Sequence, residues 1–447
     1  MQVVMRYGRT GLPLDFPEDW AVDIIAKKPM PVLDDPAASL HDALSGGDLD
    51  EEARGCRSAC ILICDITRPV PNSLILPILI KRLIDAGIPA ERITVLVATG
   101  LHRPNLGDEL RELVGDDPVL NSVTIANHFA RDDDAHEYLG ETTRGTPVSL
   151  DRRFPQADLR IVVGLVEPHF MAGYSGGRKL IAPGIAHHST IVSLHRAGLL
   201  AHPRAANCVM EGNPVHDELL QIARMADNLT TRPLGRELDS LPIHSAGEGV
   251  QLPPQRSCCE GVLAVNVVID EDRRPAYISF GDIERSHEAA VSFTRPYVEV
   301  PVGRRYRTII TSAGGYPLDK TYYQTVKGMV GAIDILEPGG GLFVVSECSE
   351  GLGSAEYVEA QRRLIALGPQ GFVREMANKE SASIDEWQTQ MQLKAMLAGK
   401  IHLHAPCLSA ADADLTGVRC VDDVVQSVRE RPIAVIPEGP YVIPVYR

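Results

Sequence analysis

Short β-branched runs alternate with longer helical stretches along the chain, a pattern typical of α/β proteins. In the first half, apolar runs predict strands at Cys60–Cys64, Thr94–Ala98, Leu159–Val166 and Val262–Ile269. A helical stretch around Ile78–Ala86 follows the first of these strands. The first half is therefore predicted to form an α/β unit.

The second half starts a fresh series of strands and helices, which indicates a second α/β unit. Its predicted strands are Arg307–Thr311, Leu342–Ser346 and Ile401–His404, and its predicted helices are Tyr322–Ile335, Ala355–Leu367 and Ile384–Leu397. The segment Thr294–Arg305, which contains two prolines, is interpreted as an interdomain linker.

A chain of 447 residues exceeds the size at which a single core stops growing, so two domains are expected. We assign residues 1–295 to an N-terminal α/β domain and residues 304–430 to a C-terminal α/β domain that closes over the site, with the active-site cleft between them. The proline-containing tail, 432–447, is expected to pack back on the N-terminal domain as an edge strand or a crossing segment. Residues 227–257 show no clear apolar period and are interpreted as a surface insertion.

Composition narrows the class of protein. Apolar residues make up 44% and charged residues 23%, as is ordinary for a soluble globular protein. The net charge of −15 argues against a nucleic-acid partner, and an anionic substrate would need local Lys and Arg. The N-terminus has no signal-peptide pattern, the apolar runs are too short to cross a membrane, and the nine cysteines form no CxxC pair, so a cytoplasmic location is expected.

Two related polar motifs follow predicted strands, where open α/β sheets bind their ligands. The first is Asp65-Ile-Thr-Arg-Pro, in which Asp65 and Arg68 could hold a polar ligand; a helix N-cap beside a surface arginine is the alternative. The second is Gly100-Leu-His-Arg-Pro, in which His102 could move protons near neutral pH; a solvated loop histidine is the alternative.

A third cluster is denser and lies between Glu167 and Lys179. It includes His169, Gly173, Ser175, Gly176, Gly177, Arg178 and Lys179. Three glycines within five residues let backbone N–H groups approach an anion, and Lys179 could serve as a covalent anchor. A tight turn alone would explain the glycines, but the accompanying polar side chains favour a functional loop.

Further candidates stand downstream. His187 and His188 are adjacent, and their spacing alone does not identify both as metal ligands. No HExxH signature is present, so a single histidine such as His195 would bind a metal only if a cofactor supplies the other ligands. Gln324 and Lys327 share a face of a predicted helix and suit a carboxylate, although a solvated helix face is the common explanation. Trp387 either belongs to the core or forms the wall of a pocket.

Taken together, these motifs resemble the nickel-dependent lactate racemase family over nearly the whole chain. The most specific stretch is EPHFMAGYSGGRKLIAPGIAHHSTIVSLH, from Glu167 to His195. The DxTRP and GxHRP motifs precede it in the family's order, and the Gln-x-x-Lys pair and a later tryptophan follow it.

The resemblance implies a cofactor and a set of residue roles. The cofactor is a nickel-pincer nucleotide, pyridinium-3-thioamide-5-thiocarboxylic acid mononucleotide with nickel, bound covalently to Lys179. By resemblance, His195 supplies a nickel ligand, and His102 and His169 act as acid and base on the substrate hydroxyl. The implied cofactor-binding set is Lys179, Asp65, Gly173, Ser175, Gly176, Gly177 and Arg178, and the implied substrate-binding set is Arg68, Gln324, Lys327 and Trp387.

The implied function is racemisation or epimerisation of a small 2-hydroxy acid of the lactate type, by proton-coupled hydride transfer to and from the cofactor through a transient 2-keto acid. The implied partners are this substrate and the host's cofactor-biosynthesis proteins, without nucleic acid or membrane. Three alternatives stay open: an epimerase of a larger acid such as a sugar acid, malate or an aryl hydroxy acid; an NAD-dependent dehydrogenase, for which no GxGxxG motif follows a first strand; and a non-catalytic cofactor or metal carrier, which would not need two histidines.

Overall fold

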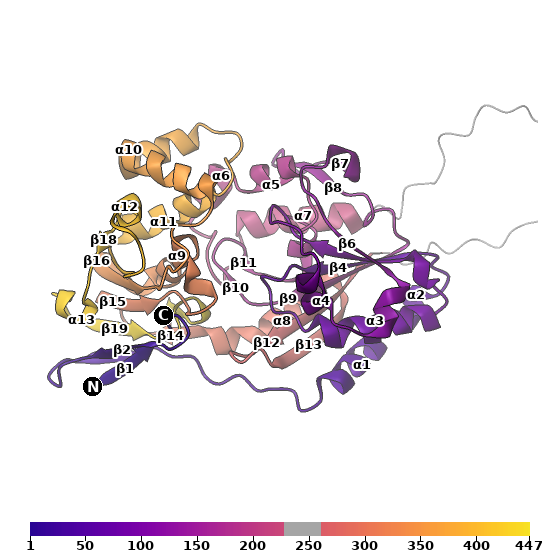
Figure 1. Ribbon diagram of the computed structural model, residues 1–447, viewed down its shortest axis with the longest axis horizontal. Helices are drawn as coiled ribbons and strands as arrows, with labels where there is room; N and C mark the ends of the chain where they lie inside the picture. The colour runs from indigo at the N-terminus through magenta and orange to yellow at the C-terminus, as the bar shows by residue number, and fades with distance from the viewer. Residues whose placement is uncertain (228–260) are drawn as a thin grey trace, which may run out of the picture.

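The protein is described by a computed structural model, which covers residues 1–227 and 261–447. The surface insertion interpreted at 227–257 lies, apart from Asp227, outside the described residues. Two six-stranded sheets form the framework, and each lies in its own half of the molecule (Figure 1). This arrangement confirms the predicted α/β class.

The first sheet has the strand order β13-β12-β9-β4-β5-β6, in which every neighbouring pair is parallel except β12 and β13. Its strands are β4 (Ala59–Cys64), β5 (Ile93–Ala98), β6 (Thr124–Asn127), β9 (Leu159–Leu165), β12 (Val262–Ile269) and β13 (Pro275–Asp282). The four strands predicted in this half coincide with β4, β5, β9 and β12 to within one residue at each end.

Both faces of this sheet are buried, which explains why its strands are apolar throughout. In β4, Ile61 and Ile63 face one hydrophobic cluster, while Cys60 and Leu62 face another. The first cluster is covered by helices α1 (Pro36–Gly46), α2 (Leu49–Ala53), α3 (Asn72–Asp85) and α4 (Asp108–Val114). The second is covered by α5 (His188–Leu194), α6 (Ala197–Leu200), α7 (Pro214–Asp227) and the small sheet of β7 (His136–Glu141) and β8 (Pro147–Asp151).

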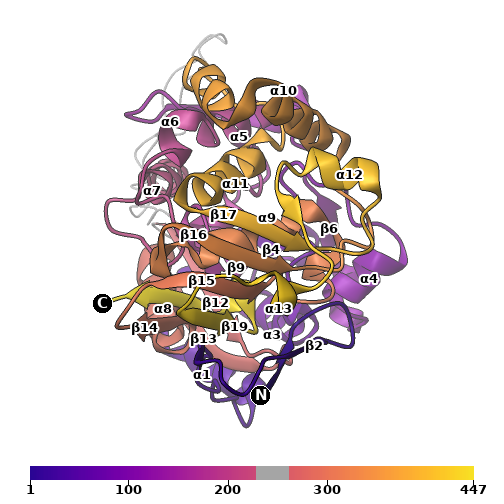
Figure 2. The same ribbon diagram turned by 90° about the vertical axis from the view of Figure 1, so that its left-hand side faces the viewer.

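The second sheet is parallel throughout and has the order β18-β17-β16-β15-β19-β3. Its strands are β3 (Val22–Ile24), β15 (Tyr306–Ser312), β16 (Leu336–Val345), β17 (Lys400–His404), β18 (Arg419–Cys420) and β19 (Ile433–Ile436). The helices of this half are α9 (Tyr322–Gly331), α10 (Ala355–Ala377), α11 (Glu386–Ala398), α12 (Ala410–Leu415) and α13 (Val424–Ser427). Figure 2 shows this sheet in front, with α11 above it and the N-terminal hairpin below.

The segment Thr294–Arg305, interpreted as an interdomain linker, consists largely of regular secondary structure. Helix α8 (Ile283–Val298) continues through Pro296, and strand β14 (Glu299–Val302) follows it directly. A proline in the last helical turn removes few hydrogen bonds, and the buried Thr294 and Val298 hold that turn against the core. The proline and charged residues at the end of this helix therefore have a composition that is also typical of a linker.

The chain termini also differ from the sequence-based division. Strand β3 lies at the edge of the second sheet beside β19, and β19 is an inner strand between β15 and β3 rather than a tail on the first domain. Pro432 and Pro437 flank β19 instead of interrupting it, so its ladder is intact. The last strand, β20 (Ile443–Tyr446), pairs with β14.

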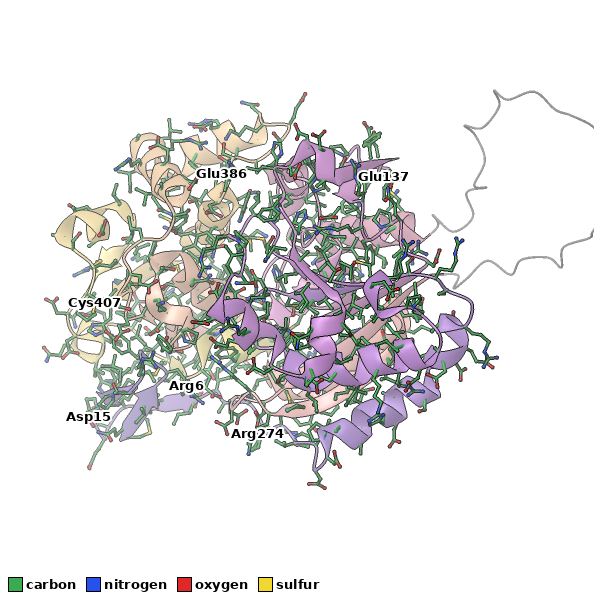
Figure 3. The ribbon with its side chains drawn as sticks, turned by 45° about the vertical axis from the view of Figure 1, so that its right-hand side comes forward. Arg6, Asp15, Glu137, Arg274, Glu386 and Cys407 are labelled. Carbon is green, nitrogen blue, oxygen red and sulfur yellow. The ribbon has the colours of Figure 1, made fainter. Side chains whose placement is uncertain are left out.

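The N-terminal hairpin, β1 (Gln2–Met5) and β2 (Leu12–Asp15), also belongs with the second sheet. Met5 and Leu14 pack in one buried cluster with Ile310, Phe343 and residues of α13. Figure 3 shows the labelled hairpin residues Arg6 and Asp15 on the same side of the molecule as Cys407. Residues 1–25 are thus associated with the second sheet, although the sequence-based division assigned them to the first domain.

The two halves share buried contacts. One hydrophobic cluster contains residues from both sheets, such as Leu62 of β4 and Leu342 of β16. The backbone N–H of Ala382 donates to the carbonyl of Val192 at 3.1 Å, and the side chain of Gln390 donates to the carbonyl of Ala197 at 3.2 Å. Helices α5 and α6 therefore meet the α10–α11 region, as Figure 1 also shows.

Among residues 1–227 and 261–447, no helix is both long enough and apolar enough to span a bilayer.

Candidate active site

Three neighbouring parallel strands present their carboxyl ends to the same place. Strand β4 lies between β5 and β9, so the residues that follow these strands meet at one edge of the sheet. Asp65 follows β4, His102 lies in the turn after β5, and His169 comes shortly after β9. The sheet order therefore brings together three motifs that are separated in sequence.

Asp65 holds His102. The Oδ2 atom of the buried Asp65 lies 2.5 Å from Nδ1 of His102, and its Oδ1 accepts hydrogen bonds from the hydroxyl and backbone N–H of Thr67. Burial alone would raise the pKa of Asp65, but the hydrogen bond and charge of His102, together with Thr67 and Arg68, lower it. The carboxylate thus stays ionised, and His102 donates through Nδ1 with Nε2 left for other partners. The alternative of a helix N-cap does not hold for Asp65, since α3 begins at Asn72.

His169 lies on a short hairpin, β10 (Pro168–His169) with β11 (Gly173–Tyr174). Its Nδ1 accepts the backbone N–H groups of Met171 and Ala172, both at 3.2 Å, which leaves Nε2 as the nitrogen that can exchange a proton with a ligand. Burial lowers the pKa of His169 well below its usual range, and the charges of Lys179, Arg68 and Lys327 lower it further. These three cations must therefore be close to this imidazole.

The glycine-rich loop packs against the sheet. Gly173 and Gly176 have φ of 79° and 80°, and a Cβ on Gly176 would lie 2.7 Å from the side chain of Val166. The Gly177 N–H donates to Oδ1 of Asn266 on β12 at 3.0 Å. The hydroxyl of the buried Ser175 donates to the Leu165 carbonyl at 2.7 Å. These residues shape the turn before Lys179, and their contact with a cofactor stays a prediction.

Arg178 points into the protein. Its side chain is 2% exposed and donates to the carbonyls of Ala172 and Tyr174, and a third nitrogen contact goes to His287. Burial lowers the pKa of Arg178 to about 9. In the described structure the hydrogen bonds of this guanidinium hold the loop together. These bonds need no cofactor, and direct binding of a cofactor by Arg178 stays a prediction.

Lys179 is the lysine of the loop and lies in a partly buried position. Burial lowers the pKa of Lys179 to about 7, and the neighbouring charges of Arg178, Arg68 and Lys327 contribute. A large fraction of this amine is therefore neutral and nucleophilic at neutral pH, as a lysine that forms a covalent bond requires.

His195 caps the end of α5 and faces the second half of the molecule. Its Nδ1–H donates to the Ile191 carbonyl at 2.8 Å, so Nε2 carries the free lone pair. Burial lowers the pKa of His195 to about 4, which keeps the imidazole neutral. The ring lies against Trp387 of α11, with 4.4 Å between centroids, and the indole N–H donates to the Tyr323 hydroxyl at 3.2 Å. The neutral His195 imidazole, with its proton on Nδ1 and a free lone pair on Nε2, is the tautomer that a metal ligand needs.

Helix α9 presents Gln324 and Lys327 one turn apart, as predicted. Burial lowers the pKa of Lys327 to about 7, and the charge of Arg68 lowers it further, so Lys327 from the second half lies near Arg68 from the first. Arg68 also lies 3.7 Å from the carboxylate of Glu167. The Oε1 atom of Gln324 is buried and has no hydrogen-bond partner within the described part of the chain. A buried acceptor without a donor fits a site that holds a ligand.

Sequence reasoning missed three residues that hold the site together. Asn266 is a polar residue in the middle of the apolar strand β12, and that contrast was a usable signal. His287 donates to the Ser175 carbonyl at 2.7 Å, and Tyr323 holds the Trp387 indole. The last two lie among ordinary helical residues, where nothing in the sequence distinguishes them.

Comparisons with known proteins agree with this geometry. The family model described as the lactate racemase N-terminal domain matches residues 7–207, and the lactate racemase C-terminal domain matches residues 304–443. The chain is 30% identical over 419 residues to a lactate racemase from Lactiplantibacillus plantarum, covering 91% of this chain and 89% of that protein. It is 27% identical over 407 residues to a lactate racemase from Thermoanaerobacterium thermosaccharolyticum, covering 89% and 87%.

Solved structures are similar as well. The lactate racemase apoprotein from Thermoanaerobacterium thermosaccharolyticum matches with a TM-score of 0.84 at 25% identity, covering 99% of this chain and 100% of that one. A protein from Thermotoga maritima matches with a TM-score of 0.65 at 15% identity, covering 92% and 98%, and this likeness concerns the fold alone.

Proposed function

Because the chain belongs to the lactate racemase family, we propose that it interconverts the enantiomers of a small 2-hydroxy acid of the lactate type. The enzyme is accordingly an isomerase. The observation that carries the proposal is the pair of fixed histidines, His102 on Asp65 and His169 on two backbone N–H groups, at neighbouring strand ends among three cations. Two proton-exchanging groups suit a substrate whose hydroxyl lies on opposite sides in the two enantiomers.

The substrate carboxylate would bind to Arg68 and Lys327. Both are cations of the site, one from each half of the molecule, and Gln324 adds an amide beside Lys327. Charge-assisted hydrogen bonds of this kind fix the orientation of a carboxylate in a water-poor site. The acid's C2 carbon and hydroxyl would then lie between the two histidines.

Proton transfer would use Nε2 of both histidines: Nε2 of His102, left free by the contact of Nδ1 with Asp65, can accept the hydroxyl proton, and the Nε2–H of His169 can donate one. The Asp65 carboxylate accepts from Nδ1 of His102 and so orients the ring with Nε2 toward a ligand. His169 is held neutral by burial and by the charges of Lys179, Arg68 and Lys327. Acylation of Lys179 and carboxylate binding by Arg68 and Lys327 would remove or offset these charges, and so raise the pKa of His169 toward the range useful for acid–base catalysis.

The residues also fit the nickel-pincer nucleotide that the family resemblance implies. Lys179 offers a partly neutral amine for the covalent bond, and His195 offers a neutral imidazole with Nε2 free. When bound, this cofactor would supply an acceptor for the hydrogen and electron pair that leave C2. The chain's part is to hold the cofactor through Lys179 and His195, to orient the acid, and to move the hydroxyl proton through His102 and His169.

The test is racemisation by nickel-loaded protein from a host that makes the cofactor. We expect enantiopure L-lactate to be converted to a racemic mixture, measured by chiral chromatography, with malate, phenyllactate and gluconate as a panel for the alternatives. Lys179→Ala should lose the covalent adduct in intact-protein mass spectrometry and the activity, whereas His41→Ala, an exposed histidine of α1, should retain both. Protein that carries the adduct but racemises no 2-hydroxy acid would overturn the proposal.

A further inference from the structure

A second group of potential metal ligands lies outside the candidate active site. It consists of Asp133, at the start of a short helical turn (Asp133–Ala135), and the consecutive His187 and His188 at the beginning of α5. One ligand atom from each residue lies within 4.8 Å of the others. In sequence the histidines are 54 and 55 residues from the aspartate, so only the fold brings the three together.

We propose that Asp133, His187 and His188 form a binding site for a divalent first-row transition-metal ion, distinct from the cofactor site at Lys179 and His195. Nε2 of His187 lies 2.8 Å from Oδ1 of Asp133 and 3.2 Å from Nδ1 of His188. Ligand atoms about 2.0–2.2 Å from a tetrahedral ion are themselves roughly 3.3 Å apart, and the two contacts of His187 lie within a few tenths of an ångström of that spacing. Two imidazoles and a carboxylate are the ligand set that such ions prefer.

The backbone holds both histidines before any ion binds. The His187 N–H donates to the Ser149 carbonyl at 2.9 Å, and the His188 N–H donates to the Ala130 carbonyl at 2.8 Å. The hydroxyl of Ser189 lies 2.8 Å from Nδ1 of His187 and can accept its proton when Nε2 binds a metal, at the expense of a weak 3.3 Å bond from the Ser189 N–H. This is the outer hydrogen bond that metal-binding histidines usually make.

The charge balance also permits a cation. Burial and the neighbouring His187 lower the pKa of His188, which leaves this imidazole neutral and able to coordinate. The helix dipole opposes a cation at the beginning of a helix, and the negative charge of Asp133 offsets this repulsion. The Asp133 side chain is 86% exposed, which gives an ion access and leaves room for water as a further ligand.

The site would connect to the active centre through α5. His188 begins this helix and His195 caps its other end, seven residues later. Metal binding would tie the beginning of α5 to the turn at Asp133, next to strand β7, whose Glu137 is labelled in Figure 3. It would thereby fix the helix that positions the imidazole beside Trp387.

The experiment compares metal binding by wild type with that of two ligand variants and two control variants, using full-length protein free of cofactor. Zn²⁺ is the probe in equilibrium dialysis with elemental analysis, and Co²⁺ is the probe for visible absorption of the bound ion. We expect wild type to bind one Zn²⁺ more than Asp133→Asn or His188→Ala at the same free concentration, with affinity about tenfold or more weaker in the variants. Zn²⁺ should raise the Tm of wild type but not of these variants.

The matched control is Asp132→Asn, the adjacent carboxylate, whose side chain makes no capping hydrogen bond. It should bind the extra ion like wild type, and so should His195→Ala, which separates this site from the cofactor site. Circular dichroism of each variant without metal establishes that the fold is retained. Equal Zn²⁺ content in wild type and Asp133→Asn, or equal loss in Asp132→Asn, would overturn the proposal.

Discussion

The 2.5 Å contact between the Asp65 carboxylate and Nδ1 of His102 determines which nitrogen of this histidine carries a proton. Oδ1 of the same carboxylate is held by Thr67, so its orientation is fixed on both sides. The His102 side chain itself is 61% exposed, and without Asp65 nothing else in the described structure holds its ring. The orientation of the proposed acid–base group His102 therefore depends on the neighbouring Asp65.

We predict that Asp65→Asn lowers kcat by about 10²–10⁴-fold with a smaller effect on KM, because an amide can donate to Nδ1 and favour the wrong tautomer. Asp108→Asn, a change of an exposed carboxylate nearby on α4, is the matched control. Since the hydrogen bonds and charges around Asp65 lower its pKa, this carboxylate is expected to stay ionised at neutral pH. An Asp65→Asn enzyme with normal kcat would show that His102 needs no positioning.

At the scale of elements, the site depends on a contact between helices of the two halves. His195 at the end of α5 lies against Trp387 of α11, and Tyr323 of α9 accepts the indole N–H. The 7% exposed indole thus forms a wall that limits the orientations of the imidazole. The hydrogen bond to Ile191 within α5 and the packing of Trp387 from the second half together fix the His195 ring.

Replacing the Trp387 indole tests whether this contact positions His195. We predict that Trp387→Ala lowers bound nickel per covalent adduct and kcat together, because His195 can rotate, while Trp387→Phe keeps the ring contact and retains most of the nickel. Metal analysis against intact mass measures the ratio directly. If Trp387→Ala keeps full nickel but raises KM, the indole contacts the substrate and does not position the ligand.

The elements themselves were predictable where burial is two-sided. The apolar runs of β4, β5, β9 and β12 reveal buried parallel strands without any alignment. Strand β3 has only three residues, and no local pattern marks so short an edge strand. Strand β16 begins at Leu336, earlier than predicted. The prediction began it later because a run of proline and glycine, which is unusual in a strand, lies inside it. Helix α10 likewise continues past a kink at Gly368.

The candidate site was predictable to a similar degree. Motifs at strand ends identify Asp65, His102 and His169, since strand order converts sequence position into proximity. The internal role of Arg178 could not be foreseen, because a loop sequence does not say which way a side chain points. The partnership of Trp387 with His195 joins two halves of the chain, and only tertiary packing creates it.

At the scale of the whole molecule, a protein with a net charge of −15 gathers cations where its halves meet. Arg68 and Lys179 come from the first half and Lys327 from the second, and each lowers the pKa of His169. Without an anionic ligand these like charges repel across the interface, and part of the folding free energy is spent on holding them together. Function and stability therefore oppose each other at this position.

The variant Lys327→Met tests this opposition between function and stability in cofactor-free protein. The pKa of Lys327 is lowered to about 7 from an unfolded value of 10.5, so the unfolded state binds more protons between these values and stability rises with pH across that window. The cost of burying the charge is fully present below about pH 7. We predict that Lys327→Met is more stable than wild type at pH 7 by about 1 kcal/mol, or roughly 2 °C in Tm, and that this advantage shrinks as pH approaches 10.

Lactate should raise the Tm of wild type and leave that of the variant nearly unchanged, because the variant lacks the cation that binds the carboxylate. Lys320→Met, which removes a partly exposed lysine paired with Glu350, should gain no stability. A loss of stability in Lys327→Met at pH 7, with an unchanged response to lactate, would mean that Lys327 is a structural residue and that the carboxylate binds elsewhere.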